Sequence, residues 1–348
     1  MPKLSRPIPE TADELLETGL LDSWYLVCRD VEIGTKPIGL KRLNRNIVLW
    51  RNREGKVEAV DDFCPHRGAK LSLGHVCDGE IACEYHGVQV NGKGVVTATP
   101  PQPDSGMVGR KLLTSYPVEE RHGGIWLYFS LGDRDEEPPP LRFPDEFESG
   151  EWQGFLDMRE FGCNWQLVRD NQFDPVHGSY LHVGTHALQA GQKAADMGYE
   201  KTERGFVVWR KNQQGVNLDK TWLEYYDHSG FWAISDIPYP KKECGGLGRL
   251  FRYPTPIDRQ NTLVWNYRMM RHQGWKRDAW RFLYRNRASD HGAVVLEQDR
   301  VALGAIEFEP WQKETLLQCD IGVSHIRRLY RAKAEEQLKA VRSQIAAE

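Results

Sequence analysis

The sequence contains no apolar run long enough to cross a membrane. A membrane-spanning helix needs about 18 apolar residues, whereas the longest apolar stretches, such as residues 125–129, have the length of a strand. The amino terminus lacks the apolar core of a secretion signal. Cysteine is sparse, with seven residues, which excludes a disulfide scaffold. These absences predict a soluble, cytoplasmic protein with no membrane partner.

An excess of positive charge is also absent. Lysine and arginine total 46 against 49 aspartate and glutamate residues, so the net charge is −3. A protein that binds nucleic acid by neutralising phosphates is usually far more basic, so no nucleic-acid partner is expected. With 40% hydrophobic and 27% charged residues the chain is typical of a globular protein, and its 348 residues predict two domains.

The order of strand-like and helix-like segments predicts an α+β fold. Short β-branched and aromatic runs predict an all-β domain over residues 20–132, with a hairpin between residues 46–50 and 56–60. An acidic, proline-rich connector over residues 133–152 is expected to be solvated. In the remaining domain, residues 153–348, we expect an antiparallel sheet with helices. The other expected elements are strands at 24–28, 87–96, 124–130, 205–210, 222–226, 231–237, 250–253 and 263–270, and helices at 164–183, 290–308 and 324–347.

Two short segments of the all-β region each combine one cysteine with one histidine. Cys64 and His66 form C-x-H, and Cys83 and His86 follow as C-x₂-H. These four side chains have the ligand types of a structural zinc site. Zinc fingers, however, usually pair cysteine with cysteine and histidine with histidine, whereas each half-site here mixes the two. A [2Fe–2S] cluster with two thiolates on one iron and two imidazoles on the other needs such a set.

The strings CPHRG and CEYHG make this region resemble the Rieske family. The resemblance implies that Cys64, His66, Cys83 and His86 hold one [2Fe–2S] cluster on two hairpin loops, with zinc as the main rival. The glycine at the end of each string lets its loop turn tightly beside the metal.

A second group of polar residues fills the segment 170–182. His177 and His182 are five residues apart, which in a regular helix places them about 140° apart. They converge only if the helix widens or breaks near Pro175 and Gly178. With a carboxylate as third ligand, two histidines form the facial triad of non-haem Fe(II) oxygenases.

Asp299 is the candidate for that carboxylate. It lies near Ala302 and Ile306 on the apolar stripe of its expected helix, and a carboxylate facing a core is costly unless it is paired or binds metal. Glu297, close to Arg300, is expected to be an ordinary solvated acid.

The string D-N-x₂-D-x₂-H-x₄-H, followed more than a hundred residues later by E-x-D, resembles the catalytic domain of Rieske non-haem iron oxygenases. The likeness is to the single-subunit type, which includes carbazole dioxygenase and the vanillate and dicamba O-demethylases. It implies a helix-grip catalytic domain, one mononuclear Fe(II) per subunit bound by His177, His182 and Asp299, and a head-to-tail α₃ homotrimer. It also implies that Asp174 bridges a mononuclear-site histidine of one subunit to a Rieske histidine of its neighbour.

The chain has no G-x-G-x-x-G dinucleotide fingerprint, so it cannot take electrons from NAD(P)H by itself. A separate flavin reductase, with or without a ferredoxin, is expected to supply them, and Arg67, Lys70 and Arg110 are candidates for its docking rim. The resemblance implies O₂ and a small aromatic or heterocyclic compound as substrates, and ring mono- or dioxygenation as the reaction. Oxidative O- or N-demethylation is the alternative at the same iron, and a Rieske electron carrier without oxygenase activity is the alternative of another class. The candidates for an apolar pocket are Phe173, Val176, Trp222, Phe231, Trp265 and Tyr267.

Overall fold

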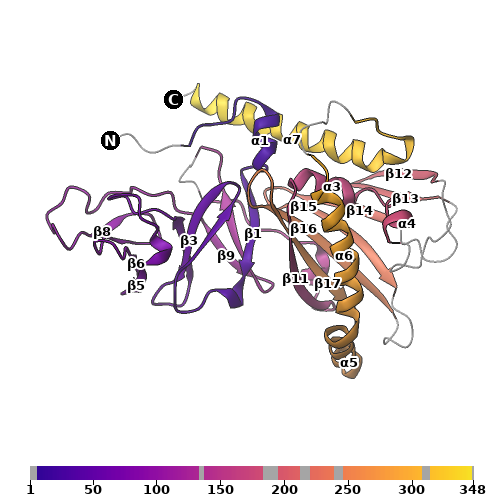
Figure 1. The fold of residues 1–348 in the computed structure, drawn as a ribbon, viewed down its shortest axis with the longest axis horizontal. Helices are drawn as coiled ribbons and strands as arrows, with labels where there is room; N and C mark the ends of the chain where they lie inside the picture. Colours follow the sequence, from indigo (N-terminus) through magenta and orange to yellow (C-terminus); the bar gives the residue numbers. More distant parts are fainter. Residues whose placement is uncertain are drawn as a thin grey trace. The chain divides into compact units, whose positions relative to one another are not determined.

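The computed structural model describes residues 6–132, 137–182, 195–211, 220–238, 246–307 and 314–346. The chain divides into two compact units, Met1–Leu141 with Glu335–Glu348 and Arg142–Ala334. Figure 1 gives the order of their elements along the chain. Within the described ranges, no helix is both long and apolar enough to cross a lipid bilayer.

The first unit consists of small antiparallel sheets, in agreement with the all-β prediction. In one sheet β1 (Ser23–Arg29) pairs with β10 (Gly124–Phe129), which pairs with β9 (Val118–Arg121). A second sheet contains β2 (Ile38–Arg42), β3 (Arg45–Arg51) and β4 (Val57–Asp61), and a third contains β5 (His75–Cys77), β6 (Glu80–Ala82), β7 (Gln89–Val90) and β8 (Val96–Ala98). Helix α1 (Ala12–Thr18) and the 3₁₀ turns η1 (Asp30–Glu32) and η2 (Leu71–Leu73) complete it.

The single strand expected over residues 87–96 was wrong, because the chain turns between β7 and β8. The amide of Asn91 donates to the carbonyl of Val95, and the amide of Gly94 donates to the carbonyl of Asn91. Gly94 has φ +75°, which a residue with a side chain rarely adopts. The turn therefore interrupts a run that reads as one strand from composition alone.

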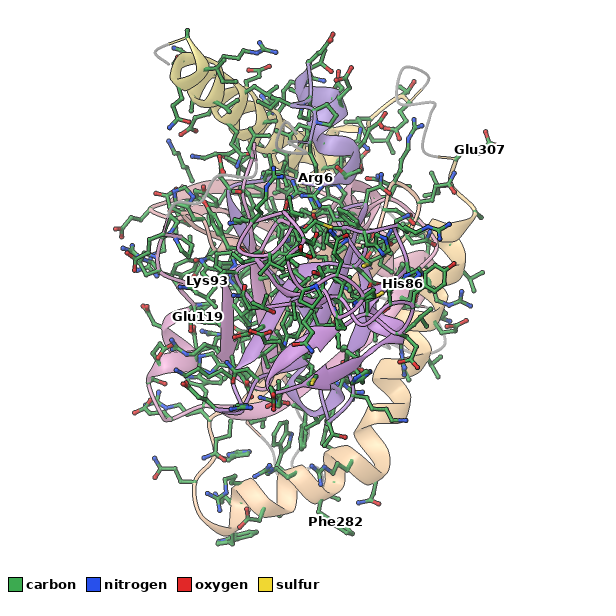
Figure 2. All side chains as sticks on the ribbon, turned by 90° about the vertical axis from the view of Figure 1, so that its left-hand side faces the viewer. Arg6, His86, Lys93, Glu119, Phe282 and Glu307 are labelled. Carbon is green, nitrogen blue, oxygen red and sulfur yellow. The ribbon has the colours of Figure 1, made fainter. Side chains whose placement is uncertain are left out.

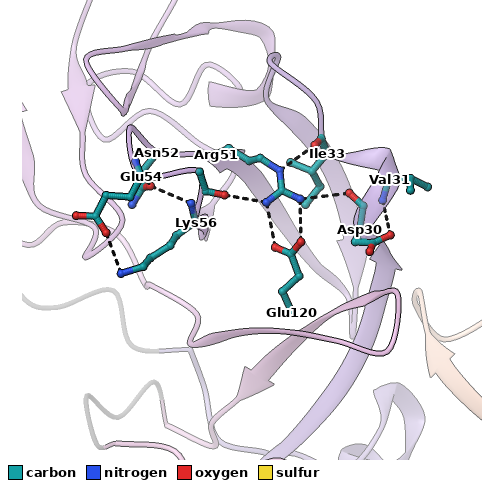
Figure 3. Close-up of polar contacts among 9 residues, drawn as sticks. Asp30, Val31, Ile33, Arg51, Asn52, Glu54, Lys56 and Glu120 are labelled. Carbon is teal, nitrogen blue, oxygen red and sulfur yellow. Dashed lines mark hydrogen bonds and ion pairs between the residues drawn. The ribbon is translucent and has the colours of Figure 1, made fainter. Parts of the chain in front are cut away.

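The expected hairpin between β3 and β4 is confirmed. In its loop the side chain of Asn52 accepts from the amides of Glu54 and Lys56 at 3.0 and 3.1 Å, as asparagine does in turns (Figure 3). Arg51, at the end of β3, forms a two-pronged ion pair with Glu120 of β9 at 3.0 and 3.1 Å. The loop is thus fixed by its own side chains and by a neighbouring sheet.

The second unit contains a seven-stranded antiparallel sheet. Its order is β11 (Gln153–Phe161), β17 (Thr262–Met270), β16 (Leu247–Pro256), β15 (Gly230–Pro238), β14 (Lys220–Tyr226), β13 (Gly205–Arg210) and β12 (Met197–Thr202). The helical segments are α2 (Asp145–Glu148), α3 (Trp165–Gln172), α4 (Gly178–Leu181), α5 (Trp275–Leu283), the π-helix η4 (Tyr284–Ala288), α6 (Ser289–Gly304), η6 (Gln318–Asp320) and the first part of α7 (Ile321–Ile345), which belongs to the first unit from Glu335 onward. A sheet combined with helices confirms the predicted α+β class.

One face of this sheet packs against helices α3 and α6 (Figure 1). Leu167 and Val168 of α3 and Leu303 of α6 form a buried cluster with Phe161 of β11 and Val264 of β17. Because side chains alternate along a strand, the residues two positions apart from Val264 also lie on this face. We call it the helix-covered face.

The opposite face is covered by aromatic side chains from the predicted connector. Phe147 of α2 is buried, and its ring centre lies 5.3 Å from Trp232, 5.0 Å from Phe251 and 4.9 Å from Tyr267. Phe143 is buried beside it. The expectation of a solvated connector was therefore wrong for its second half, because two phenylalanines among the acidic residues have a hydrophobic face to pack against. Residues 133–136 of the connector lie outside the described residues.

The helix expected over residues 164–183 is interrupted as predicted. Helix α3 ends at Gln172, with Phe173 as its C-cap, and α4 begins at Gly178. The helices expected at 290–308 and 324–347 correspond to α6 and α7. The expected end points Val183, Phe308 and Ala347 lie outside the described residues.

Candidate functional site: two metal centres

Two loops of the first unit share one backbone pattern. The amide of Cys64 donates to the carbonyl of Ala69 at 2.6 Å, and the carbonyl of Cys64 accepts from the amide of Gly68 at 2.8 Å. The second loop repeats both bonds between Cys83 and the residues five and four positions on, each at 2.9 Å. Gly68 and Gly87 have φ +77° and +71°, so both turns need the freedom of glycine.

These loops place the two thiols in the hydrophobic core of the unit and the two imidazoles nearer its surface. Cys64 and Cys83 belong to the hydrophobic core of the unit, with 3% and 1% of their surface exposed. His66 is exposed, and His86, which Figure 2 labels, is partly exposed. The centres of the two rings lie 4.7 Å apart. Burial raises the pKa of the Cys64 thiol to about 11, so the thiolate form at neutral pH requires a bound cation.

The four donors are arranged by type. The two thiols belong to the same core cluster, and the two imidazole rings lie side by side nearer the surface of the unit. Two thiolates at one end and two imidazoles at the other suit a cluster with an iron at each end.

The second centre forms where the helix breaks. His177 lies in the turn between α3 and α4, and His182 caps the end of α4. Their ring centres lie 5.3 Å apart. An unbroken helix points two such histidines in different directions, so the interruption between Gln172 and Gly178 is what lets them converge.

Asp299 of α6 completes this cluster. Its Oδ1 lies 3.4 Å from Nε2 of His177 and 3.2 Å from Nε2 of His182. An octahedral ion with bonds of about 2.1 Å separates neighbouring ligand atoms by about 3 Å, so the spacing fits one metal ion. The three residues leave the remaining positions of such an ion to exchangeable ligands.

The environment of Asp299 agrees with its expected role. Its exposure is 7%, whereas Glu297 is exposed and paired with Arg300 at 2.8 Å, as predicted. The expected stripe was partly wrong, because Ile306 is exposed; the apolar residues of α6 that pack inward are Leu296 and Leu303. These lie three residues before and four residues after Asp299.

The pKa values of His177 and Asp299 show that this cluster favours a positive charge beside the carboxylate. Burial alone lowers the pKa of His177, but hydrogen bonds to Asp174 and Asp299 raise it to about 10. Burial raises the pKa of Asp299, and its bonds to His177 and His182 overcome this, so its pKa lies below the usual range. A buried carboxylate that favours a charged imidazole this strongly also attracts a divalent cation.

Two side chains that the sequence analysis did not identify support these ligands. The Oε1 of Gln298 lies 2.9 Å from Nδ1 of His182, so it accepts the N–H on the side away from the cluster. The amide of Asn171 lies 3.2 Å from Oδ1 of Asp299 and 3.3 Å from Nε2 of His177. Gln298 directly precedes Asp299 in the chain, and neighbouring residues of a helix usually point in different directions. The sequence alone therefore did not indicate that both contact His182.

Asp174 contacts His177 with both its backbone and its side chain. Its carbonyl accepts a hydrogen bond from Nδ1 of His177, while Oδ2 lies 3.7 Å from that nitrogen, within ion-pair range. Its Oδ1 accepts from the amide of Val176 at 2.9 Å. With 27% of the side chain exposed, the carboxylate keeps access to a second partner.

The sequence comparisons agree with this pair of centres. A model described as "Rieske [2Fe-2S] domain" matches residues 23–117, and one described as "Vanillate O-demethylase oxygenase C-terminal domain" matches residues 161–336, half of the chain. This chain is a Rieske oxygenase of the vanillate O-demethylase type. The assignment covers both the unit with the paired loops and the unit with the His-His-Asp cluster.

This Rieske oxygenase is similar to one curated relative and to two solved structures in particular. It is 40% identical over 220 residues to the vanillate O-demethylase oxygenase subunit of Pseudomonas sp. (strain HR199 / DSM 7063), covering 62% of this chain and 59% of that protein. The match thus spans less than two thirds of the curated relative. The fold resembles a crystal structure of dicamba monooxygenase bound to dicamba, with TM-score 0.74 and 21% identity over 93% of this chain and 99% of that one. It also resembles the oxygenase in a fluorene-bound ferredoxin complex of carbazole 1,9a-dioxygenase, with TM-score 0.73, 20% identity and 92% coverage of each chain.

Proposed function

We propose that this chain is the terminal oxygenase component of an enzyme system that oxygenates an aromatic compound. The observation that carries the proposal is the cluster of His177, His182 and Asp299, in which two imidazole nitrogens face one carboxylate oxygen. Two histidines and one carboxylate that leave open positions are the ligand set of oxygen-activating non-haem iron. An electron carrier without oxygenase activity has no use for this cluster.

The residues at each centre follow from their donor types. Cys64 and Cys83 would supply thiolates, and His66 and His86 imidazoles, to one [2Fe–2S] cluster. The cluster of His177, His182 and Asp299 would hold one mononuclear Fe(II). When bound, these groups supply one-electron transfer and oxygen activation. The protein's own contribution is to hold the ligands: Gln298 fixes the ring of His182, and the carbonyl of Asp174 fixes the ring of His177.

We further propose that electrons come from a separate flavin reductase, with or without a ferredoxin. The carbazole 1,9a-dioxygenase structures, in which an oxygenase is in complex with a ferredoxin, support this partner. The exposed side chains of His66, Arg67 and Lys70 make the loop region accessible to a docking protein. A head-to-tail homotrimer, in which Asp174 contacts a Rieske histidine of the neighbouring subunit, belongs to the same proposal.

Oxidative O-demethylation is a specific form of this activity, and the family match favours it over ring dihydroxylation. The model that covers half of the chain is that of vanillate O-demethylase, and the 40% identical relative has the same name. Ring mono- or dioxygenation uses the same iron ligands, so the ligands themselves do not distinguish the two reactions.

Metal analysis and oxygen uptake with a generic flavin reductase test the proposal. We expect three irons and two acid-labile sulfides per chain, and oxygen uptake with one or more of a panel of aromatic acids, aryl ethers and heteroarenes. Formaldehyde release from an aryl methyl ether identifies demethylation, and a hydroxylated ring identifies oxygenation. Two irons per chain with no oxygen uptake would show an electron carrier instead, and a colourless zinc protein would refute both.

A further inference from the structure

Arg252 of β16 is a cation within the second unit that has no carboxylate partner among the described residues. Its Nη2 donates to Oγ of Ser235 at 2.7 Å, and its Nε is buried with no hydrogen-bond partner. The residue as a whole is nevertheless not fully buried. A guanidinium has five N–H donors, and Ser235 is the one acceptor that Arg252 has within the described ranges of the chain.

Arg252 lies on the helix-covered face, the same face as the metal cluster. It pairs with Asn266 across the sheet, and Asn266 is two residues from Val264, which packs against α3 and α6. By the same alternation Trp265 and Tyr267 lie on the opposite face, where Tyr267 packs against Phe147. Trp265 and Tyr267 therefore face away from the metal cluster, whereas Arg252 lies on the same side of the sheet as the cluster.

The charges around Arg252 leave the region short of negative charge. Burial lowers its pKa to about 10; Asp299 acts against this shift, whereas Arg169 and Arg268 add to it. Arg268 has its own anion, Asp157, at 3.2 Å. Once a cation binds Asp299, the one carboxylate that favours the charged form of Arg252 is neutralised. The site with its metal is then more positive and favours an anion.

The neighbours of Arg252 suit a carboxylate ligand. Ser235 lies 3.0 Å from Thr221, so its hydroxyl can donate there while it accepts from Arg252 and fixes the guanidinium. Arginine binds a carboxylate with two parallel hydrogen bonds, which fixes position as well as charge.

We propose that Arg252 binds the carboxylate of an aromatic acid and so directs the ring of the substrate toward the His177–His182–Asp299 cluster. Ser235 is a positioning residue for Arg252. This inference rests on the proposed oxygenase function and adds its substrate class. It predicts that the protein prefers an acid to the neutral amide of the same shape.

The test is calorimetric binding to the metal-loaded full-length protein, without oxygen, of matched acid and amide pairs. The pairs are benzoate and benzamide, 4-methoxybenzoate and 4-methoxybenzamide, and 3,4-dimethoxybenzoate and its amide. For the wild type we expect at least one acid to bind about 30-fold or more tightly than its amide, the loss typical of removing one partner of a buried charge pair. The variant R252Q is expected to lose this preference to within about threefold, and R252K to keep part of it, because lysine offers a point charge rather than a fork.

Two controls separate a local effect from a general one. R271Q removes the same charge from an arginine whose side chain is 61% exposed, and it is expected to keep the acid preference. S235A is expected to weaken acid binding about 2- to 12-fold and to leave amide binding unchanged, because it removes one hydrogen bond to the guanidinium. If R252Q does not retain its metals, S235A and the wild-type comparison decide the question.

A wild type with no acid preference in any pair, including one that binds no acid at all, would overturn the assignment of Arg252. So would an R252Q variant that keeps its metals and the full preference. Both results leave the oxygenase proposal standing as long as the protein contains mononuclear iron and takes up oxygen. Loss of the oxygenase proposal would instead appear as absence of that iron in the wild type.

Discussion

Replacing Gln298 with leucine tests whether a residue that touches no metal controls the mononuclear site. Gln298 accepts the N–H of His182 at 2.9 Å, and His182 has only 4% of its surface exposed, so water cannot readily take the place of the lost acceptor. Loss of such an outer hydrogen bond typically weakens metal binding 10- to 100-fold. This corresponds to about 1.4–2.7 kcal/mol. The burial of His182 favours the upper part of that range.

The measurement is iron content after equilibrium dialysis against a series of free Fe(II) concentrations, in the absence of oxygen. The Rieske spectrum serves as an internal control, because Gln298 lies in the other unit and its replacement should leave that spectrum unchanged. Q298E is the matched variant, since it keeps an acceptor oxygen at the same position. We expect Q298E to bind Fe(II) at least as well as the wild type does.

An unchanged Fe(II) affinity in Q298L would refute the reasoning, since it would mean that the ring of His182 is oriented by something other than this bond. An equal loss in Q298L and Q298E would also contradict it, because the hydrogen-bond acceptor would then be irrelevant.

Three further substitutions test the ligands themselves. Asp299→Ala should leave the Rieske spectrum intact and abolish both bound mononuclear iron, measured by metal analysis, and turnover. Normal turnover would show that Asp299 is not a ligand and would make Glu297 the candidate for the third ligand. His66→Cys or His86→Cys should keep a cluster but lower its reduction potential in a redox titration, and an unchanged potential would show that these histidines are not ligands. Asp174→Asn should keep both metals and slow electron passage between them by at least tenfold, as rapid-mixing oxidation of the pre-reduced cluster would reveal; wild-type rates would exclude the bridge.

The Rieske loops were predictable because the residues that define each loop are close together in the sequence. Each loop carries its ligands and its glycine within five residues of sequence, so the motif and the backbone turn come together. The helix break was predictable for the same reason, since Pro175 and Gly178 are themselves in the segment. The predicted domain limits and the cytoplasmic location stay predictions.

Residues that act through distant contacts were not predictable. Gln298 and Asn171 look like ordinary polar helix residues, and only the packing of α6 against α3 brings them to the ligands. In the sequence Arg252 does not differ from the other charged residues of the strands. Only the pairing of its strand with β15 and β17 shows that it lies on the helix-covered face. Phe147, in an acidic segment, gave no apolar pattern, yet it fills the opposite face of the same sheet.

In β15, β16 and β17 the side chains of successive residues point to opposite faces of the sheet. The packing that stabilises the domain and the polar groups near the iron ligands therefore come from different residues. Phe251 and its neighbours Arg252 and Leu250 follow one another in sequence, yet Phe251 belongs to the aromatic packing and Arg252 to the polar region near the iron ligands. Selection for a new substrate can therefore change polar positions of the helix-covered face, such as Arg252, while Phe251 and the aromatic residues of the opposite face keep their packing. Laboratory evolution of this chain is best confined to those polar positions, because Val264 on the same face belongs to the buried cluster that joins the sheet to α3 and α6.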